Sequence, residues 1–171
     1  TAERYKQDFP DLIDYDKNVA ALKEVQPAPI KASDIAVRIG TSWIDKEIYK
    51  EFFCQLIDMP YYMRDGIELY YNKHDSSWRV DRTTSYARNY RSMKITNVYG
   101  TSRANAYRLF EDCLNQRFTQ IYDTVLDEDG REKRVLNQSE TVAAREKQNK
   151  IKEAFKDWIF TSPVRRDELE A

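Results

Sequence analysis

The sequence predicts an α+β domain: a small, mainly antiparallel sheet with two hairpins, packed against two or three helices. Two pairs of alternating apolar segments, each joined by a polar turn, predict the hairpins, and segments with one apolar helical face separate them. The chain has 171 residues, of which 41% are hydrophobic and 33% charged, enough for one core. No apolar run is long enough to cross a bilayer. We expect no membrane partner.

The domain boundaries follow from the prolines and the first periodic segments. Pro27 and Pro29 cannot both lie inside a helix, so residues 1–31 are predicted to be an N-terminal connector with a short helix. Residues 32–162 are predicted to form the single α+β domain, and residues 163–171 the start of a linker. Because the chain begins with Thr1 and ends inside a charged stretch, we expect it to be a fragment of a longer polypeptide.

Alternating apolar residues predict the strands. The alternation over residues 35–39 predicts a first strand. Residues 67–71 and 78–80, joined by the polar NKHDSS segment, predict the first hairpin. A short strand is expected over residues 93–98, and the arms FTQIYDTVL and REKRVL, joined through a turn at residues 128–130, predict the second hairpin.

Capping residues predict two of the helices. Asp45, alone or with Ser42, can cap a helix whose apolar residues extend to Leu56. Asn137 and Glu140 form a capping-box pattern that opens the longest helix, which is expected to end near residue 160.

A third helix follows a tight turn in the segment 98–117. Gly100 can take a positive φ, and Thr101 or Ser102 can cap the helix, whose apolar face predicts a core helix. Arg103 would then stand in the first turn, where open amides and a guanidinium could hold a phosphate. Alternatively, Arg103 pairs with a carboxylate elsewhere in the fold.

The charge is unevenly distributed. The chain has a net charge of −1, but the segment 79–108 carries seven cationic side chains and only Asp81 as an acid. Basic residues among tyrosines and tryptophans are typical of nucleic-acid surfaces, since arginines contact phosphates and rings stack on bases. The other interpretation is that these cations solvate one sheet face and pair with neighbouring acids. The candidate DNA-contacting residues are Arg79, Arg82, Arg88, Arg91, Lys94, Arg103 and Arg108.

Catalytic motifs are missing from the sequence. The four glycines form neither a dinucleotide-binding turn nor a P-loop, so we expect no bound cofactor and no ATPase site in this segment. His74 is the only histidine, which argues against a metal site or a nucleophile–histidine pair. Cys54 and Cys113 are flanked by helical apolar residues and are predicted to be reduced core thiols, which indicates the cytoplasm. The three tryptophans are predicted to be core residues.

One short segment resembles a catalytic motif without matching it. Asp58, Met59, Pro60 and Tyr61 are similar to the DPPY motif with which amino-group DNA methylases hold a flipped base. Methionine replaces the first proline and no cofactor-binding turn precedes it. We therefore interpret the segment as a helix stop followed by aromatic packing.

Longer motifs carry a family resemblance from Asn18 to Arg166. The segments NVAALKEVQP, IAVRIGTSWI, MPYY, VYGTSRANAYRLFEDCLN and ETVAAREKQNKIKEAFKDWIF resemble part of very large bacterial proteins of mobile elements. These proteins fuse a DNA methylase to a Swi/Snf-type helicase and are often labelled as restriction-enzyme-like subunits. Thr41 departs from the family's alanine.

The resemblance implies a position between the methylase and the helicase motor, with DNA methyltransferase and ATP-dependent helicase activities in the flanking domains. It assigns no catalytic residue to this segment. We therefore expect a non-catalytic accessory domain that contacts the DNA backbone. The alternative is a docking or spacer module whose partners are the flanking methylase and helicase domains of the same chain.

Overall fold

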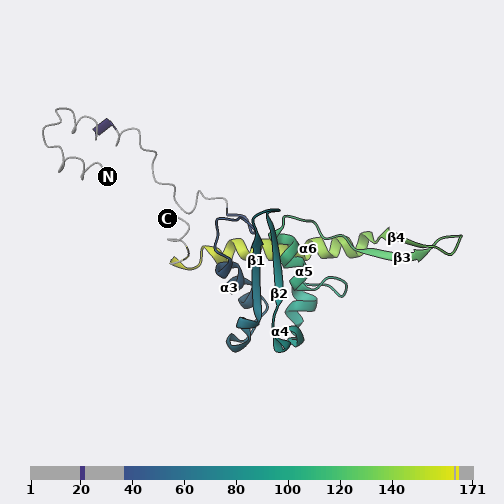
Figure 1. Ribbon diagram of the computed structural model, residues 1–171, viewed down its shortest axis with the longest axis horizontal. Coiled ribbons are helices and arrows are strands. Elements are labelled where there is room, and N and C mark those ends of the chain that lie inside the picture. The colour runs from purple at the N-terminus through teal and green to yellow at the C-terminus, as the bar shows by residue number, and fades with distance from the viewer. Residues whose placement is uncertain (1–19, 22–36, 164, 166–171) are drawn as a thin grey trace. The chain divides into compact units, whose positions relative to one another are not determined.

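The computed structural model describes residues 20–21, 37–163 and 165. The chain divides into two units, residues 1–35 and 36–171 (Figure 1). In the first unit only Ala20 and Ala21 are described, and both are helical. The predicted connector over residues 1–31 and most of the predicted linker over residues 163–171 therefore lie outside the described residues.

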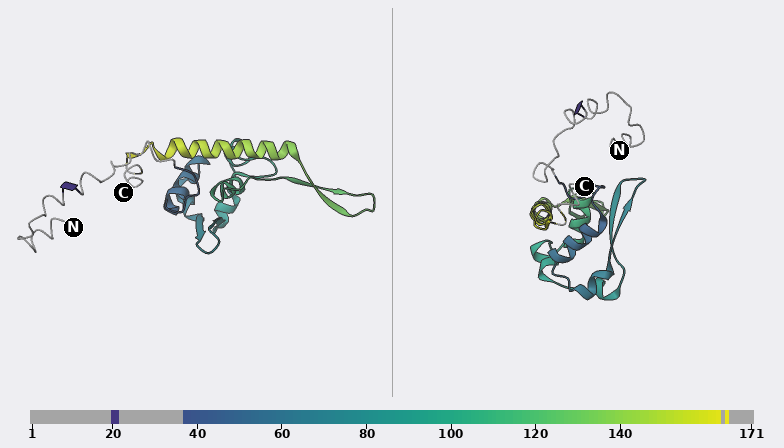
Figure 2. Two further views of the ribbon diagram at one scale, coloured as in Figure 1. Left: turned by 90° about the horizontal axis from the view of Figure 1, so that it is seen from above. Right: turned by 90° about the vertical axis from the view of Figure 1, so that its left-hand side faces the viewer.

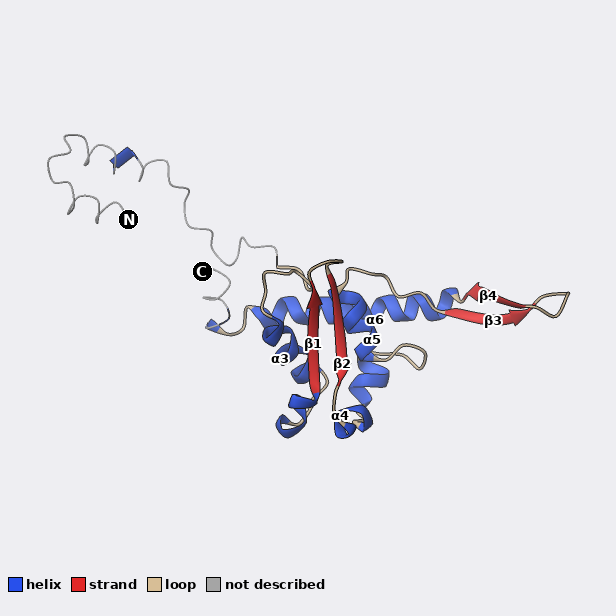
Figure 3. Ribbon diagram, in the orientation of Figure 1, coloured by secondary structure: helices blue, strands red, loops and turns tan. Residues whose placement is uncertain are grey.

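The second unit has the expected α+β composition (Figure 3). The two predicted hairpins are confirmed, but they form two separate antiparallel sheets, β1–β2 and β3–β4, within the described part of the chain. The elements in chain order are α3 (Lys46–Leu56), the 3-10 helix η2 (Tyr61–Gly66), β1 (Ile67–Asn72), β2 (Ser77–Arg82), α4 (Ser85–Asn89), the π-helical turn η3 (Lys94–Val98), α5 (Ala106–Leu114), β3 (Tyr122–Leu126), β4 (Glu132–Leu136) and α6 (Gln138–Ile159).

The β1–β2 hairpin buries one face and has one edge covered by a helix. Leu69 lies opposite Val80 in the register, and with Ile67 and Trp78 it faces the core. The outer edge of β2 packs against α5. There the side chain of Asn115 bonds both polar backbone groups of Trp78, so a helix takes the place of a third strand.

Aromatic side chains from three helices fill the core. Phe53 of α3 stacks on Phe110 of α5, with ring centroids 4.4 Å apart. Phe52 of α3 meets Phe155 of α6 edge-on at 5.1 Å, and all four rings are almost completely buried. Such aromatic burial is a large apolar contribution to the stability of one domain. Cys54 and Cys113 are free and buried, as predicted.

The first predicted strand is wrong. Of residues 35–39, the described ones form a loop and a turn, although Val37 and Ile39 are buried. The side chain of Gln116 donates to the Ile39 carbonyl, so this backbone group is satisfied without a strand partner. Gly40 takes a φ of +90°, and a Cβ there would lie 2.0 Å from the Leu114 carbonyl oxygen. Close packing on the end of α5 therefore fixes this segment.

The strand predicted over residues 93–98 is also wrong, because the chain forms η3 there with only Ile95 of that turn buried. Gly100 is needed for close packing and not for a positive φ, since a Cβ would lie 2.0 Å from the Ile95 carbonyl oxygen. The helix starts later than predicted: Asn105 caps α5 by accepting from the Arg108 amide, while Thr101 accepts from the amides of residues 103 and 104 in the preceding turn.

The helices that begin at Asp45 and Asn137 are confirmed. Asp45 accepts from the Glu47 amide at 2.7 Å, and Asn137 accepts from the Glu140 amide at 3.0 Å. Helix α6 then runs to Ile159 along one side of the second unit, and the β3–β4 hairpin continues beyond the other elements of this unit (Figure 2). The hairpin strands are largely exposed.

Candidate nucleic-acid interface

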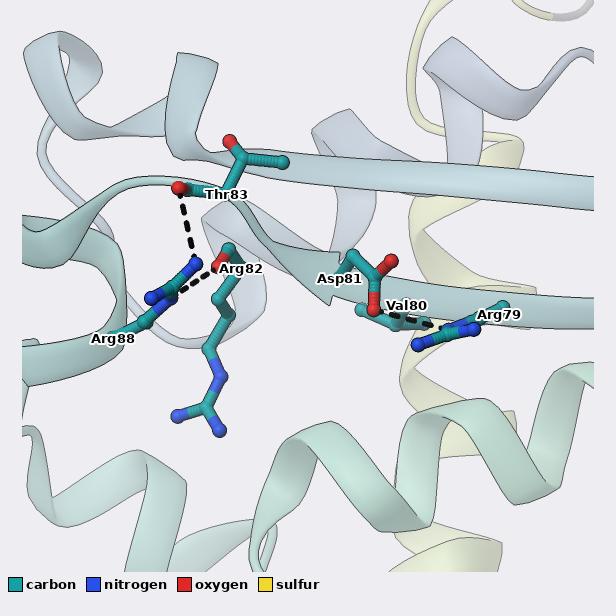
Figure 4. A pocket seen from close by; sticks show the side chains of 6 residues that line it. All are labelled: Arg79, Val80, Asp81, Arg82, Thr83 and Arg88. Atoms are coloured by element: carbon teal, nitrogen blue, oxygen red, sulfur yellow. Dashed lines mark hydrogen bonds and ion pairs between the residues drawn. The ribbon is translucent and has the colours of Figure 1, made fainter.

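A pocket of about 430 Å³ lies beside the end of β2. Three of the predicted DNA-contacting residues, Arg79, Arg82 and Arg88, line it (Figure 4). The sequence brings them together simply: Arg79 and Arg82 belong to β2, and the short loop after β2 leads directly into α4, which carries Arg88. The remaining lining residues are Val80, Asp81 and Thr83.

Backbone and ring contacts hold two of these arginines. The Arg88 Nε donates to the Arg82 carbonyl at 2.8 Å, which uses one side of its guanidinium (Figure 4). Arg82 lies on the inner side of the hairpin, with its Cζ 4.8 Å from the ring centroid of Tyr107. A guanidinium over an aromatic face gains a favourable cation–π contact and keeps N–H groups free for another partner.

Tyr107 is well suited to support Arg82. Its side chain is buried, and its hydroxyl has no hydrogen-bond partner among the described residues. Burial raises the pKa of Tyr107 to about 12, while the nearby Arg82 and Arg91 act in the opposite direction. The phenol therefore stays neutral at physiological pH and presents an uncharged ring to Arg82.

The charge at this pocket is predominantly positive. Arg79 pairs with Asp81 through Nε and Oδ1, 3.1 Å apart, but the Arg79 side chain is 73% exposed and such pairs are weak. Within the described ranges, neither Arg82 nor Arg88 has a carboxylate oxygen within 4 Å. Three arginines and one exposed carboxylate thus line the pocket, and this excess of positive charge suits an anion such as a phosphate.

None of the other four predicted residues is among those that line this pocket. Arg91 stays close by and donates to the Arg88 carbonyl at 3.0 Å. Lys94 pairs with Asp58 at 2.7 Å.

Arg103 and Arg108 lie at the base of the second hairpin. Arg103 precedes α5 instead of standing in its first turn, so the predicted phosphate site at the start of this helix does not form. It pairs with Asp123 at 2.8 Å and donates to the Tyr122 carbonyl, which agrees with the alternative of a carboxylate partner elsewhere. Arg108 donates to the Gln120 carbonyl at 3.4 Å.

Exposed tyrosines beside α4 were missed by the sequence interpretation. The aromatic packing predicted after Met59 and Pro60 is wrong for Tyr61 and Tyr62, which are 84% and 72% exposed in η2. Helix η2 packs against α4, whose Tyr86 is also exposed. The two consecutive tyrosines, followed by a polar turn, were the sequence feature that could have indicated this exposure. Trp43 is likewise exposed and Trp158 half-buried, whereas Trp78 lies in the core.

The β3–β4 hairpin is acidic, in contrast to the basic pocket beside β2. Residues 122–136 contain five acids and three cations, and the turn carries consecutive acids at residues 127–129. Val125, Leu126, Val135 and Leu136 are exposed there. An acidic, apolar hairpin repels a phosphate backbone, so this part of the molecule is unsuited to DNA and better suited to a protein surface.

The fold and this pocket define an α+β domain with an arginine-lined strand end beside exposed tyrosines. Residues 38–171 match the family described as Domain of unknown function (DUF8437), and the chain belongs to this family. No curated protein and no solved structure matches the chain. Within the described part of the chain, no helix has the length and apolar character needed to span a membrane.

Proposed function

We propose that this domain is a non-catalytic accessory domain of a DNA methylase and helicase polypeptide, and that it contacts the DNA backbone without reading sequence. The observation that carries the proposal is the β2 pocket, which is lined by Arg79, Arg82 and Arg88 and has Asp81 as its one acidic lining residue. The exposed tyrosines of η2 and α4 support it, because flat rings beside guanidinium groups suit a nucleic acid. The resemblance to methylase–helicase fusions supplies the context.

We divide the seven candidate residues into principal and secondary contacts. Arg79, Arg82 and Arg88 are the principal contacts, and Arg91 lies beside them. Lys94, Arg103 and Arg108 are secondary, since none of them lines the pocket and two of them already pair with carboxylates. Contacts of this type are made to phosphates, so they weaken with salt and position the protein without base specificity.

The test is the salt dependence of duplex binding. Fluorescence anisotropy with a labelled duplex is measured from about 50 mM to about 200 mM salt. Arg79→Gln combined with Arg88→Gln is expected to lower the slope of log K against log salt by about two. The matched control is Arg131→Gln combined with Lys133→Gln, which removes two cations from the acidic hairpin and should leave the slope unchanged. No duplex binding at low salt, or equal slopes for both variants, contradicts the proposal.

The second candidate function is docking of the flanking domains. The observation that favours it is the acidic β3–β4 hairpin, in which Leu126 is 70% exposed. A hairpin of two strands has little stability of its own and gains from a partner surface. The test adds the flanking methylase and helicase domains of the parent polypeptide in trans. Leu126→Ser should weaken their association, whereas Met93→Ser, outside the hairpin and 68% exposed, should not. Equal association of both variants contradicts docking through the hairpin.

A further inference from the structure

Phe118 is a second exposed aromatic site, far along the chain from the arginines of β2. Its side chain is 66% exposed, although it follows directly on the core helix α5. Two cations of α6 lie over its ring: the Arg145 Cζ and the Lys152 Nζ are each 5.4 Å from the ring centroid. The ring is thus in contact with charged side chains and largely open to solvent.

A buried amide fixes the backbone on both sides of this ring. Gln148 is only 1% exposed. Its Nε2 donates to the Arg117 carbonyl at 3.0 Å, and its Oε1 accepts from the Thr119 amide at 3.1 Å. Thr119 is itself buried and donates to Asp112 at 2.6 Å. The fold therefore holds Phe118 at the surface by a satisfied buried side chain, so the exposure of the ring is not the result of a loose loop.

The cations around Phe118 continue as a strip along α6. Arg145, Lys152 and Lys156 lie on one face of the helix, because two and three turns separate them. Lys152 and Lys156 also line a pocket of about 360 Å³, to which Arg38 contributes from the opposite side and Glu153 is the one acidic lining residue. In the described part of the chain, none of these four cations is in an ion pair.

An exposed ring on a fixed backbone, next to cations without ion pairs among the described residues, suits a ligand that carries both phosphates and flat rings. Phosphates attract the cations away from the ring, and a flat base can then take their place on it. The exchange is favourable, because stacking of a base on an aromatic ring is worth more than an exposed contact between a cation and the ring. A base face is accessible only where the base is unpaired, so duplex DNA cannot use this ring.

We propose that Phe118 and the basic strip of α6 form a site for single-stranded nucleic acid. Phe118 stacks on one base, and Arg145, Lys152 and Lys156 bind the flanking phosphates. The site does not rest on the β2 pocket, because the two lie at opposite ends of α5: Arg82 contacts Tyr107 in the first turn, whereas Phe118 follows its last turn.

The experiment measures binding of labelled oligo(dT) and of a labelled duplex to the full chain. Phe118→Leu keeps an apolar side chain but removes the flat ring, and should weaken oligo(dT) binding about tenfold with duplex binding unchanged. Trp43→Leu is the matched control, since it removes an exposed ring elsewhere and should have no effect. Phe118→Trp should retain affinity, and its indole fluorescence should fall when oligo(dT) stacks on it.

The cations are tested separately. Arg145→Gln combined with Lys152→Gln should lower the salt slope for oligo(dT) by about 1.4, whereas Arg79→Gln with Arg88→Gln should not change it. Unchanged oligo(dT) affinity in Phe118→Leu overturns the proposal, as does equally tight competition by polyglutamate, which would identify an acidic protein as the ligand. If the Arg79→Gln, Arg88→Gln variant loses only duplex binding, or if the wild type binds no duplex at all, the result bears only on the function proposed for the β2 pocket.

Discussion

The side-chain amide of Asn115 pairs with both polar backbone groups of Trp78: the Trp78 amide donates to Oδ1 at 2.7 Å, and Nδ2 donates to the Trp78 carbonyl at 2.8 Å. Two residues further along β2, the Val80 amide donates to the Glu111 carboxylate at 2.8 Å. Both partners lie at the C-terminal end of α5. Helix α5 therefore closes the outer edge of β2 by side-chain hydrogen bonds, which explains why the sheet has only two strands.

Asn115→Ala is expected to destabilise the domain by about 2 kcal/mol, because two partly buried backbone groups lose their partners. Asn115→Asp is the informative comparison, since its carboxylate can still accept from the Trp78 amide but faces the Trp78 carbonyl with a second acceptor. Its loss should be at least as large as that of the alanine variant. Chemical denaturation measures both, and an unchanged midpoint for Asn115→Ala would show that water replaces the amide without cost.

The outer edge of β2, which α5 covers, also helps to explain which strands could be predicted from the sequence. The two hairpins are local, because each pairs neighbouring segments through a short turn, and alternation alone identifies them. The isolated alternations over residues 35–39 and 93–98 lacked such a neighbour. Asn115 and Glu111 occupy the edge of β2, and Gln116 satisfies Ile39, so no strand partner remained for the first of them.

The residues of the candidate sites also differ in whether the local sequence could predict their positions. Arg79, Arg82 and Arg88 could be placed together from the sequence, because they lie within ten residues of one another, although helix α4, which carries Arg88, was not predicted. The partner of Arg103 is a residue of the second hairpin, and nothing in the local pattern indicates it. Phe118 depends on Gln148, which lies thirty residues further along the chain, so its exposure follows only from tertiary structure. The helical spacing of Arg145 and Lys152 was the one available signal.

Gly40→Ala should cost about 3 kcal/mol of stability, since a left-handed φ of +90° is combined with a Cβ 2.0 Å from the Leu114 carbonyl oxygen. Gly130→Ala is the matched control: its φ is +74°, but no atom lies within 4 Å of the added Cβ. It should cost about 1 kcal/mol, which measures the backbone strain alone. Thermal unfolding of the two variants separates strain from packing, and equal losses would disprove the contribution of packing at Gly40.

The two cysteines should be unreactive in the folded protein at pH 8. Burial raises the pKa of Cys54 to about 11 and that of Cys113 to about 12, so the reactive thiolate is scarce. In denaturant both thiols return to their ordinary pKa of about 8.5 and should react rapidly. Alkylation followed by mass spectrometry provides the measurement. If either cysteine is labelled under native conditions as fast as in the unfolded protein, local unfolding exposes that thiol readily.

The Arg103–Asp123 pair should make part of the stability depend on acid pH. The Arg103 guanidinium, and after it the Asn137 amide, donate hydrogen bonds that lower the pKa of the Asp123 carboxyl below its ordinary value. The unfolded state therefore takes up this proton at a higher pH than the folded state. The contribution is complete above the ordinary carboxyl pKa of about 4 and is lost as the pH falls through the lower folded value.

Asp123→Asn removes this titration. The wild type should be more stable than Asp123→Asn at pH 7, and the difference should shrink as the pH falls below about 4. Glu128→Gln is the control, because this exposed carboxylate has no ion pair with any described residue. Urea unfolding at several pH values gives the three curves. A difference between wild type and Asp123→Asn that is the same at pH 3 and pH 7 would show that the carboxylate acts through its shape and not its charge.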